Sequence, residues 1–192
     1  MHKLLHKNTL RSLIVTPLLV TTISFGSTSF GRIPTLAFLN QGQVNNTLLS
    51  VDSAYEKELT LRAQKIDAYF RERNMPLEGF GAKMVEVAEE NDIDWTLIPA
   101  IAVRESTGGK NACKQVKNNP FGWGSCKIGF KSMDEAIETI GKNLGGNNPK
   151  TAVHYDEKEV KEILQSYNPP SVVPLYADQV MKIMDRIENQ EV

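Results

Sequence analysis

The chain has 192 residues, of which 41% are hydrophobic and 23% charged, and its formal net charge at pH 7 is −1. This length accommodates one ordinary domain with a leader or a tail. The apolar content suffices for a core of packed helices and excludes intrinsic disorder beyond the first ~50 residues. We found no internal repeat and no low-complexity run, which excludes solenoid and collagen-like classes.

The first 29 residues differ in kind from the rest. Three basic residues lie among the first eleven, residues 13–25 carry no charge and are mostly apolar, and residues 26–29 are small. This order predicts a secretory signal peptide over residues 1–29. A membrane anchor is the alternative, although the apolar run is shorter than the ~20 residues that span a bilayer. We therefore expect an exported protein of the cell envelope or the extracellular space, with membrane contact only if this segment stays uncleaved.

Residues 30–52 are rich in polar and small side chains and predict a linker. Helical periodicity then predicts six helices, at residues 54–74, 80–91, 97–106 (or from 95), 132–144, 160–167 and 176–187. The fourth begins with a capping box formed by Ser132 and Glu135, and no run with a period of two predicts a strand. The sequence thus predicts a single all-α domain over residues 53–190.

Glu105 lies on the apolar side of the third predicted helix. It follows Ile98 and Ile101 by seven and four residues, so it shares their helical stripe. It also falls in the last turn, where the helix dipole disfavours an anion. Both effects raise the pKa of a carboxyl, and a protonated carboxyl near neutral pH is what cleavage of a glycosidic bond requires. The alternative is a structural Glu105 that reaches solvent or pairs with Arg104 or a loop lysine.

The loop after this helix has a composition suited to sugars. Residues 106–133 contain no acidic residue, and residues 118–125 read Asn-Asn-Pro-Phe-Gly-Trp-Gly-Ser. Amides and hydroxyls bind sugar hydroxyls, an aromatic face stacks on a pyranose ring, and basic residues attract an anionic glycan. The basic residues of the loop are Lys110, Lys114, Lys117, Lys127 and Lys131. The alternative is that Phe121 and Trp123 belong to the core and the lysines to a solvated face.

Cys113 and Cys126 are the only cysteines in the chain. In an oxidising compartment such a pair predicts a disulfide. A zinc site is the competing interpretation, but after loss of the leader only His154 remains as a further soft ligand. We therefore expect a disulfide and no metal or other cofactor. Cleavage after residue 29 would leave 19 basic against 23 acidic residues, a mildly acidic balance that argues against a nucleic-acid binder.

Four motifs carry a family resemblance. Residues 101–106, Ile-Ala-Val-Arg-Glu-Ser, resemble the catalytic-helix motif of soluble lytic transglycosylases and of bacterial cell-wall N-acetylglucosaminidases, where Glu-Ser ends a helix of a lysozyme-like fold. Residues 119–122, Asn-Pro-Phe-Gly, are similar to the Asn-Leu-Phe-Gly motif of the mannosyl-glycoprotein endo-beta-N-acetylglucosaminidase-like family. Tyr167-Asn168 resembles the Tyr-Asn pair of the transglycosylases, and Tyr176 resembles the terminal tyrosine of both groups.

The resemblance spans roughly residues 92–187 and has departures. The Gly-Leu-Met-Gln segment of the transglycosylases is absent, and Pro169-Pro170 replaces the glycine that usually follows Tyr-Asn. The chain is thus closer to the glucosaminidases, or to a branch between the two groups. The resemblance implies a lysozyme-like domain in which Glu105 is the catalytic acid and Tyr167 assists it. Together with the loop composition it implies the substrate-binding residues Ser106, Asn119, Phe121, Trp123 and Tyr176.

Glu105 has no evident partner carboxylate. Asp94 precedes it by eleven residues, roughly 16 Å along a helix at 1.5 Å per residue. The sequence therefore favours a single-acid mechanism on the β-1,4 bonds of peptidoglycan. In it Glu105 acts as acid and then base, the substrate's N-acetyl group or C6 hydroxyl assists, and Tyr167 orients the acetamido group or stabilises positive charge. A non-catalytic glycan-binding module and a helical interaction protein are the alternatives. The bond that is cut, and hydrolysis against a 1,6-anhydro product, stay open.

Overall fold

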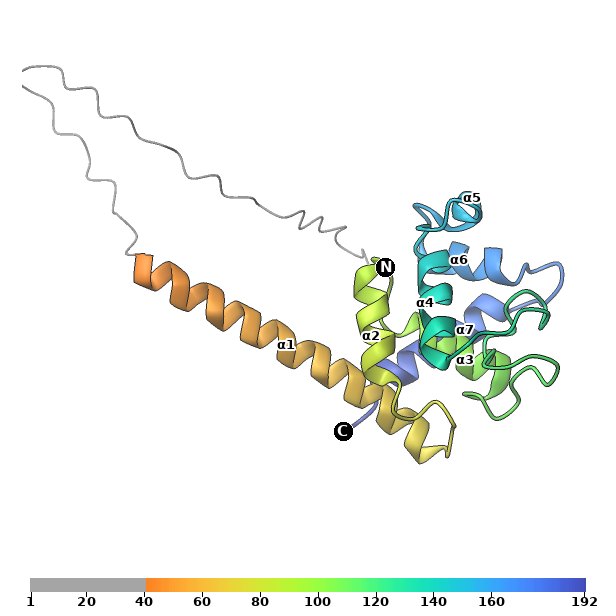
Figure 1. Cartoon of the computed structure of the whole chain (residues 1–192), viewed down its shortest axis with the longest axis horizontal. Helices are drawn as coiled ribbons and strands as arrows, with labels where there is room; N and C mark the ends of the chain where they lie inside the picture. Colours follow the sequence, from red (N-terminus) through yellow and green to blue (C-terminus); the bar gives the residue numbers. More distant parts are fainter. Residues whose placement is uncertain (1–40) are drawn as a thin grey trace, which may run out of the picture. The chain divides into compact units, whose positions relative to one another are not determined.

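The computed structural model describes residues 41–192, with side chains from residue 53 onward. The described part contains only helices and no strand, which confirms the predicted all-α domain (Figure 1). The helices are α1 (Gln41–Glu72), α2 (Gly81–Glu90), α3 (Leu97–Ser106), α4 (Met133–Leu144), α5 (Ala152–Tyr155), α6 (Val160–Tyr167) and α7 (Tyr176–Glu188). The predicted signal peptide, residues 1–29, and residues 30–40 of the predicted linker lie outside the described residues.

Two elements differ from the expectation. The helix α1 begins at Gln41 rather than near Ala54, so residues 41–52 of the predicted linker are helical. Extending an existing helix adds one hydrogen bond for each residue fixed, so Gln, Leu and Val residues continue a helix whose C-terminal half is already packed. The helix α5 was not expected because its four residues are too few to show a periodicity.

The helix α3 lies at the centre of the packed domain. Its Leu97, Ile98 and Ile101 are completely buried, and it packs against α2, α4 and α7. Its start is organised by Asp94, whose carboxylate accepts hydrogen bonds from the Thr96 N–H at 2.8 Å and the Thr96 hydroxyl at 2.5 Å. The helix ends after Ser106, because Thr107 adopts a left-handed conformation with φ 55°. Glu105 is thereby placed in the last turn of a buried helix.

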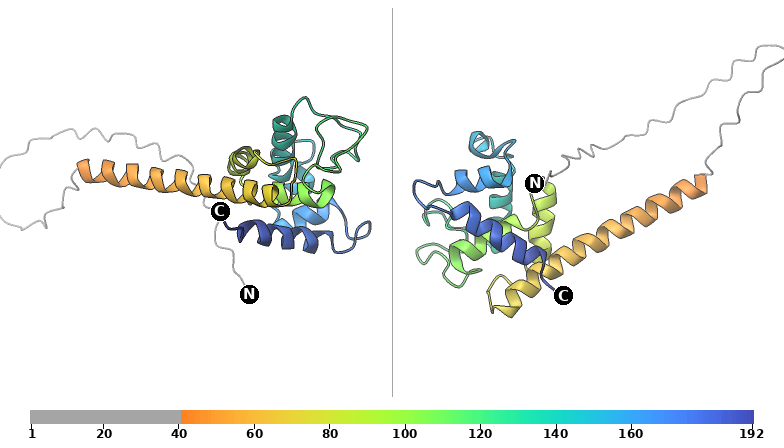
Figure 2. Two further views of the ribbon diagram at one scale, coloured as in Figure 1. Left: turned by 90° about the horizontal axis from the view of Figure 1, so that it is seen from below. Right: turned by 180° about the vertical axis from the view of Figure 1, so that it is seen from behind.

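The other helices surround α3 and close the core. The C-terminal half of α1 packs against α2 and α7, while α6 packs against α5 and α7 (Figure 2). The largest completely buried side chains include Phe70, Leu77, Met84, Leu97, Phe121, Ile137, Ile140 and Leu144. Within residues 41–192, no helix is long and apolar enough to cross a membrane.

A long loop, residues 107–131, connects α3 to α4 without regular secondary structure. It ends at Ser132, the N-cap of α4, whose hydroxyl accepts a hydrogen bond from the Glu135 N–H at 3.1 Å. This is one half of the predicted capping box, because the Glu135 carboxylate accepts from the Lys131 N–H instead of the Ser132 N–H. The buried side chains of Phe121 and Phe130 anchor the loop to the core. This loop covers the C-terminal end of α3 and so lies over Glu105.

Candidate functional site

Glu105 is half-buried, and one of its two oxygens is already bonded. Its Oε1 accepts a hydrogen bond from the hydroxyl of Tyr176, the first residue of α7, at 2.6 Å. Burial raises the pKa of Glu105 above its ordinary value, while the Tyr176 hydroxyl and the charge of Arg104 act in the opposite direction. Burial prevails, as the position on the apolar stripe led us to expect.

A cleft of about 570 Å³ opens beside Glu105. This size lies within the range of small-molecule and sugar sites. The cleft is lined by Glu105, Gly122, Trp123, Gly124, Ser125, Ile128, Thr151, Tyr167 and Asn168. Among these described lining residues, Glu105 bears the only carboxylate.

Gly122 brings the loop backbone into contact with Glu105. Its φ is +64°, a left-handed conformation that glycine adopts without strain. A Cβ atom at this position would lie 2.9 Å from Glu105 Oε2. The absence of a side chain therefore leaves room for the carboxyl group at the cleft. Gly122 belongs to the Asn-Pro-Phe-Gly motif but was not singled out as a site residue.

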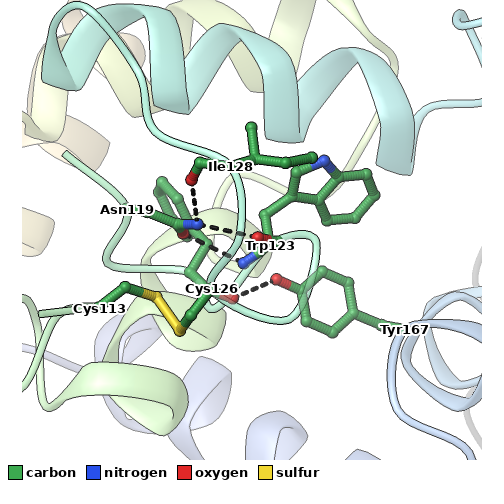
Figure 3. The surroundings of a disulfide bond; sticks show 7 residues. Cys113, Asn119, Trp123, Cys126, Ile128 and Tyr167 are labelled. Atoms are coloured by element: carbon green, nitrogen blue, oxygen red, sulfur yellow. Dashed lines mark hydrogen bonds between the residues drawn. A yellow bond between two sulfur atoms is a disulfide. The ribbon is translucent and has the colours of Figure 1, made fainter. Parts of the chain in front are cut away.

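Three of the predicted substrate-binding residues are buried and make contacts within the protein, and they do not line the cleft. Asn119 is completely buried, its Nδ2 donates to the carbonyls of Trp123 and Ile128 at 2.9 Å each, and its Oδ1 accepts from the Trp123 N–H at 3.1 Å (Figure 3). Phe121 is completely buried in the core. The buried Ser106 hydroxyl donates to the Ala102 carbonyl. None of the three is among the residues that line the cleft.

A row of aromatic rings leads from the loop to Glu105. The rings of Trp123 and Tyr167 have centroids 5.7 Å apart, and Tyr167 stacks nearly parallel to Tyr176 at 6.2 Å. The Tyr167 hydroxyl donates to the Phe121 carbonyl at 2.5 Å. Burial raises the pKa of both tyrosines well above the ordinary value, so both stay neutral. Trp123 and Tyr167 line the cleft as predicted, whereas Tyr176 is buried behind Glu105.

The predicted disulfide between Cys113 and Cys126 is confirmed. It joins the early part of the loop to the turn after Trp123, and Figure 3 shows it on the side of the loop opposite to the Trp123 and Tyr167 rings. The loop lysines are exposed, and Lys110 Nζ donates to the Arg73 carbonyl at 2.7 Å. Residues 53–192 contain no group of three or more metal-ligating side chains.

Thr151 and Ile128 also line the cleft, and the sequence had not indicated either. Thr151 comes from the short connection between α4 and α5, where no motif or periodicity marks it. Its hydroxyl donates to the buried Asn143 Oδ1 at 2.5 Å, which fixes this side of the cleft to α4. Only the tertiary structure brings Thr151 to the same cleft as the loop residues.

Comparison with models of known protein families finds no family that matches the chain, and comparison with curated proteins finds no match either. A functional assignment therefore depends on the geometry and chemistry of the cleft itself.

Proposed function

We propose that the protein is a glycosidase that cleaves β-1,4 bonds between N-acetylated sugars of peptidoglycan, with Glu105 as its general acid. The observation that carries this proposal is the half-buried Glu105 carboxyl, whose pKa is raised by burial, at a cleft with an aromatic wall. A carboxyl that keeps its proton near neutral pH is able to protonate a leaving oxygen. That the helical domain has a lysozyme-like fold is part of this proposal.

The two oxygens of Glu105 have different surroundings, which supports a directional proton transfer. Oε1 accepts a hydrogen bond from Tyr176, so the proton of the neutral acid resides on Oε2. Oε2 is the atom nearest to the vacant Cβ position of Gly122, at the lining of the cleft. The acid thus presents its proton to a glycosidic oxygen in the cleft, and Tyr176 holds the carboxyl group in that orientation.

The lack of a second carboxylate in the cleft lining favours assistance from the substrate itself. Two-carboxylate glycosidases require a partner roughly 5–5.5 Å or 6.5–9.5 Å away. Here Glu105 protonates the leaving oxygen, and the substrate's own N-acetyl oxygen or C6 hydroxyl attacks the anomeric carbon. Glu105, now a carboxylate, then takes the proton from the attacking hydroxyl or from a water molecule. When the N-acetyl oxygen attacks, an oxazolinium ring forms, and water then attacks the anomeric carbon and gives its proton to Glu105, which completes hydrolysis. When the C6 hydroxyl attacks, it gives its own proton to Glu105 and the product is a 1,6-anhydro sugar.

Tyr167 and Trp123 provide the other interactions that this reaction needs. Since the Tyr167 hydroxyl donates its proton to the Phe121 carbonyl, its oxygen keeps only the capacity to accept a hydrogen bond. Such an oxygen accepts from the acetamido N–H and stabilises positive charge at the anomeric carbon. The half-buried Trp123 indole lies at the cleft surface, where a sugar ring stacks on it.

The disulfide supports the further proposal that the protein is exported and acts on the cell wall. A stable disulfide is expected in secreted and envelope proteins and is rare in a reducing cytosol. Fractionation of cells that express the full chain tests this proposal, since the mature protein should appear outside the cytoplasm. Retention of all the protein in the cytosol would contradict it.

The decisive experiment is digestion of purified sacculi. The wild-type protein should release soluble muropeptides, and Glu105→Gln should release at least about 100-fold less, because loss of general acid catalysis costs 10²–10⁴-fold. Glu90→Gln is the matched control, since this glutamate is exposed at the end of α2 and should keep full activity. Equal release by wild type and Glu105→Gln would sink the assignment.

The same digest identifies the products. Mass spectrometry separates anhydro ends from reducing ends by one water, and the sugar at the new end identifies the bond that is cut. A wild-type protein that binds sacculi but releases nothing would instead favour the glycan-binding module, whose binding should weaken in Trp123→Ala. A protein that neither binds nor cleaves would favour the helical interaction protein.

A further inference from the structure

Arg104 adjoins Glu105 in the last turn of α3 and contacts the same tyrosine. Its Nε donates to Gln179 Oε1 at 2.8 Å, and its guanidinium carbon lies 5.5 Å from the centroid of the Tyr176 ring. Tyr176 and Gln179 are separated by three residues in the first turn of α7, so they share one helix face. One side chain of α3 therefore contacts both residues on the part of α7 that faces the site.

The Arg104 charge is not neutralised by a contact ion pair. In residues 53–192, no carboxylate lies within salt-bridge distance of its guanidinium group. Arg104 is also half-buried, so solvent screens its charge less than that of an exposed arginine. Its positive charge thus acts on the neighbouring Glu105, where it favours the carboxylate.

We propose that Arg104 is a positioning residue for the Glu105 reaction, which holds Tyr176 in place and favours the return of Glu105 to its carboxylate form. The role of Glu105 itself depends on the proposed function. A cation over the face of a tyrosine is stabilised by the ring, and the bond to Gln179 fixes the planar guanidinium group. The fixed ring then directs its hydroxyl to Glu105 Oε1.

A group that serves as acid and then as base must exist in both forms. Burial alone would keep Glu105 protonated and slow its second role. The ionisable side chains that interact electrostatically with it are Arg104 on α3, Tyr176 on α7 and Tyr167 on α6, and the loop residues of the cleft carry no charge. Since both tyrosines are neutral, Arg104 is the one full charge that opposes burial in this set.

Direct titration of Glu105 tests this coupling without an activity assay. The full chain is labelled with ¹³C at glutamate side chains, and the Glu105 carboxyl signal is identified by its loss in Glu105→Gln. In Arg104→Gln the titration midpoint of Glu105 should move to higher pH. In Arg104→Lys, which keeps the charge, it should stay near the wild-type midpoint, as in the matched control Arg186→Gln on the exposed end of α7.

An unchanged midpoint in a folded Arg104→Gln protein would overturn the proposal. Far-UV circular dichroism checks folding, and Arg104→Met provides a second neutral variant that keeps a long side chain on Tyr176. A merely structural role of Arg104 predicts lower stability with the midpoint unchanged, and this outcome also counts against the proposal.

Sacculus digestion over a range of pH provides the second readout. The acid step requires protonated Glu105, so activity falls as pH rises through its pKa, and this alkaline limb should move to higher pH in Arg104→Gln. The maximal rate should fall in the same variant because the carboxylate forms less readily. If the wild-type protein cleaves sacculi but the alkaline limb of the pH profile does not move in Arg104→Gln, the Arg104 proposal is refuted and the proposed function stands. If wild type does not cleave, the proposed function fails, and the titration still decides the coupling.

Discussion

Replacing Gly122 by alanine tests whether the loop backbone sets the position of Glu105. The left-handed conformation of Gly122 costs an L-residue roughly 1–2 kcal/mol of strain in the folded state. Alanine offsets about 0.4–1 kcal/mol of this strain, because it lowers the conformational entropy of the unfolded chain. The net loss in the free energy of unfolding is therefore about 1 kcal/mol. The added Cβ would lie 2.9 Å from Glu105 Oε2, closer than real Cβ contacts, so the carboxyl group must move. A displacement of about 1 Å at a reacting group costs about 100-fold in rate.

Gly79→Ala is the matched control for this experiment. Gly79 also has a positive φ, +92°, but nothing lies within 4 Å of its added Cβ. Urea unfolding should show a loss of stability in both variants, whereas sacculus digestion should show a loss of activity in Gly122→Ala alone. If Gly122→Ala retains more than about a tenth of the wild-type rate, or if Gly79→Ala loses as much, the contact between the loop and Glu105 does not govern the reaction.

Three further predictions concern stability. Because burial raises the pKa of Glu105, its ionisation opposes folding, so the contribution of Glu105 to stability is most favourable below the ordinary value of 4.5 and declines as pH rises through the folded pKa. Thermal unfolding of Glu105→Gln should therefore show a higher Tm than wild type at pH 7 and little difference at pH 4; the reverse order would refute the buried acid. Replacing Cys113 and Cys126 by serine opens a loop with a sequence separation of 13 and should cost about 3 kcal/mol. Calorimetry should show a Tm lower by about 6–12 °C, and reductant should affect only the wild type. Asn119→Ala leaves the Trp123 N–H and two loop carbonyls without their partner, and urea unfolding should show a loss of about 3 kcal/mol. A loss below about 1 kcal/mol would mean that water replaces the amide.

Much of the fold follows from local patterns. Helices end where the chain cannot continue them, as at Pro169 after α6 and at Gly145 after α4. Each such signal lies within a few residues of the helix that it ends, so it can be recognised in the sequence. The start of α1 at Gln41 was not evident, because polar residues continue a helix as readily as they form a linker. Periodicity reports which side chains face the core, and it placed Glu105 on the buried side of α3 correctly.

The composition of the loop predicted its chemistry but not the direction of each side chain. Amide and aromatic residues are common to a sugar site and to a loop that folds on itself, so Asn119 and Phe121 looked the same as Trp123 before the tertiary structure was known. Asn119 turned inward because three backbone groups of the loop require a buried partner. Trp123 remained at the surface of the cleft.

By itself the sequence determined an all-helical domain, the disulfide, and a carboxyl group on the buried side of a helix end, because each depends on local spacing or on the only available pair. The tertiary structure alone decided what surrounds that carboxyl group. The Tyr176 hydroxyl forms a hydrogen bond with Glu105, which is 71 residues away in the sequence. Gly122 leaves space for the second oxygen of Glu105, and Thr151 lines the same cleft from the connection between α4 and α5. Such contacts arise from the packing of distant helices, and no local pattern in the chain encodes them.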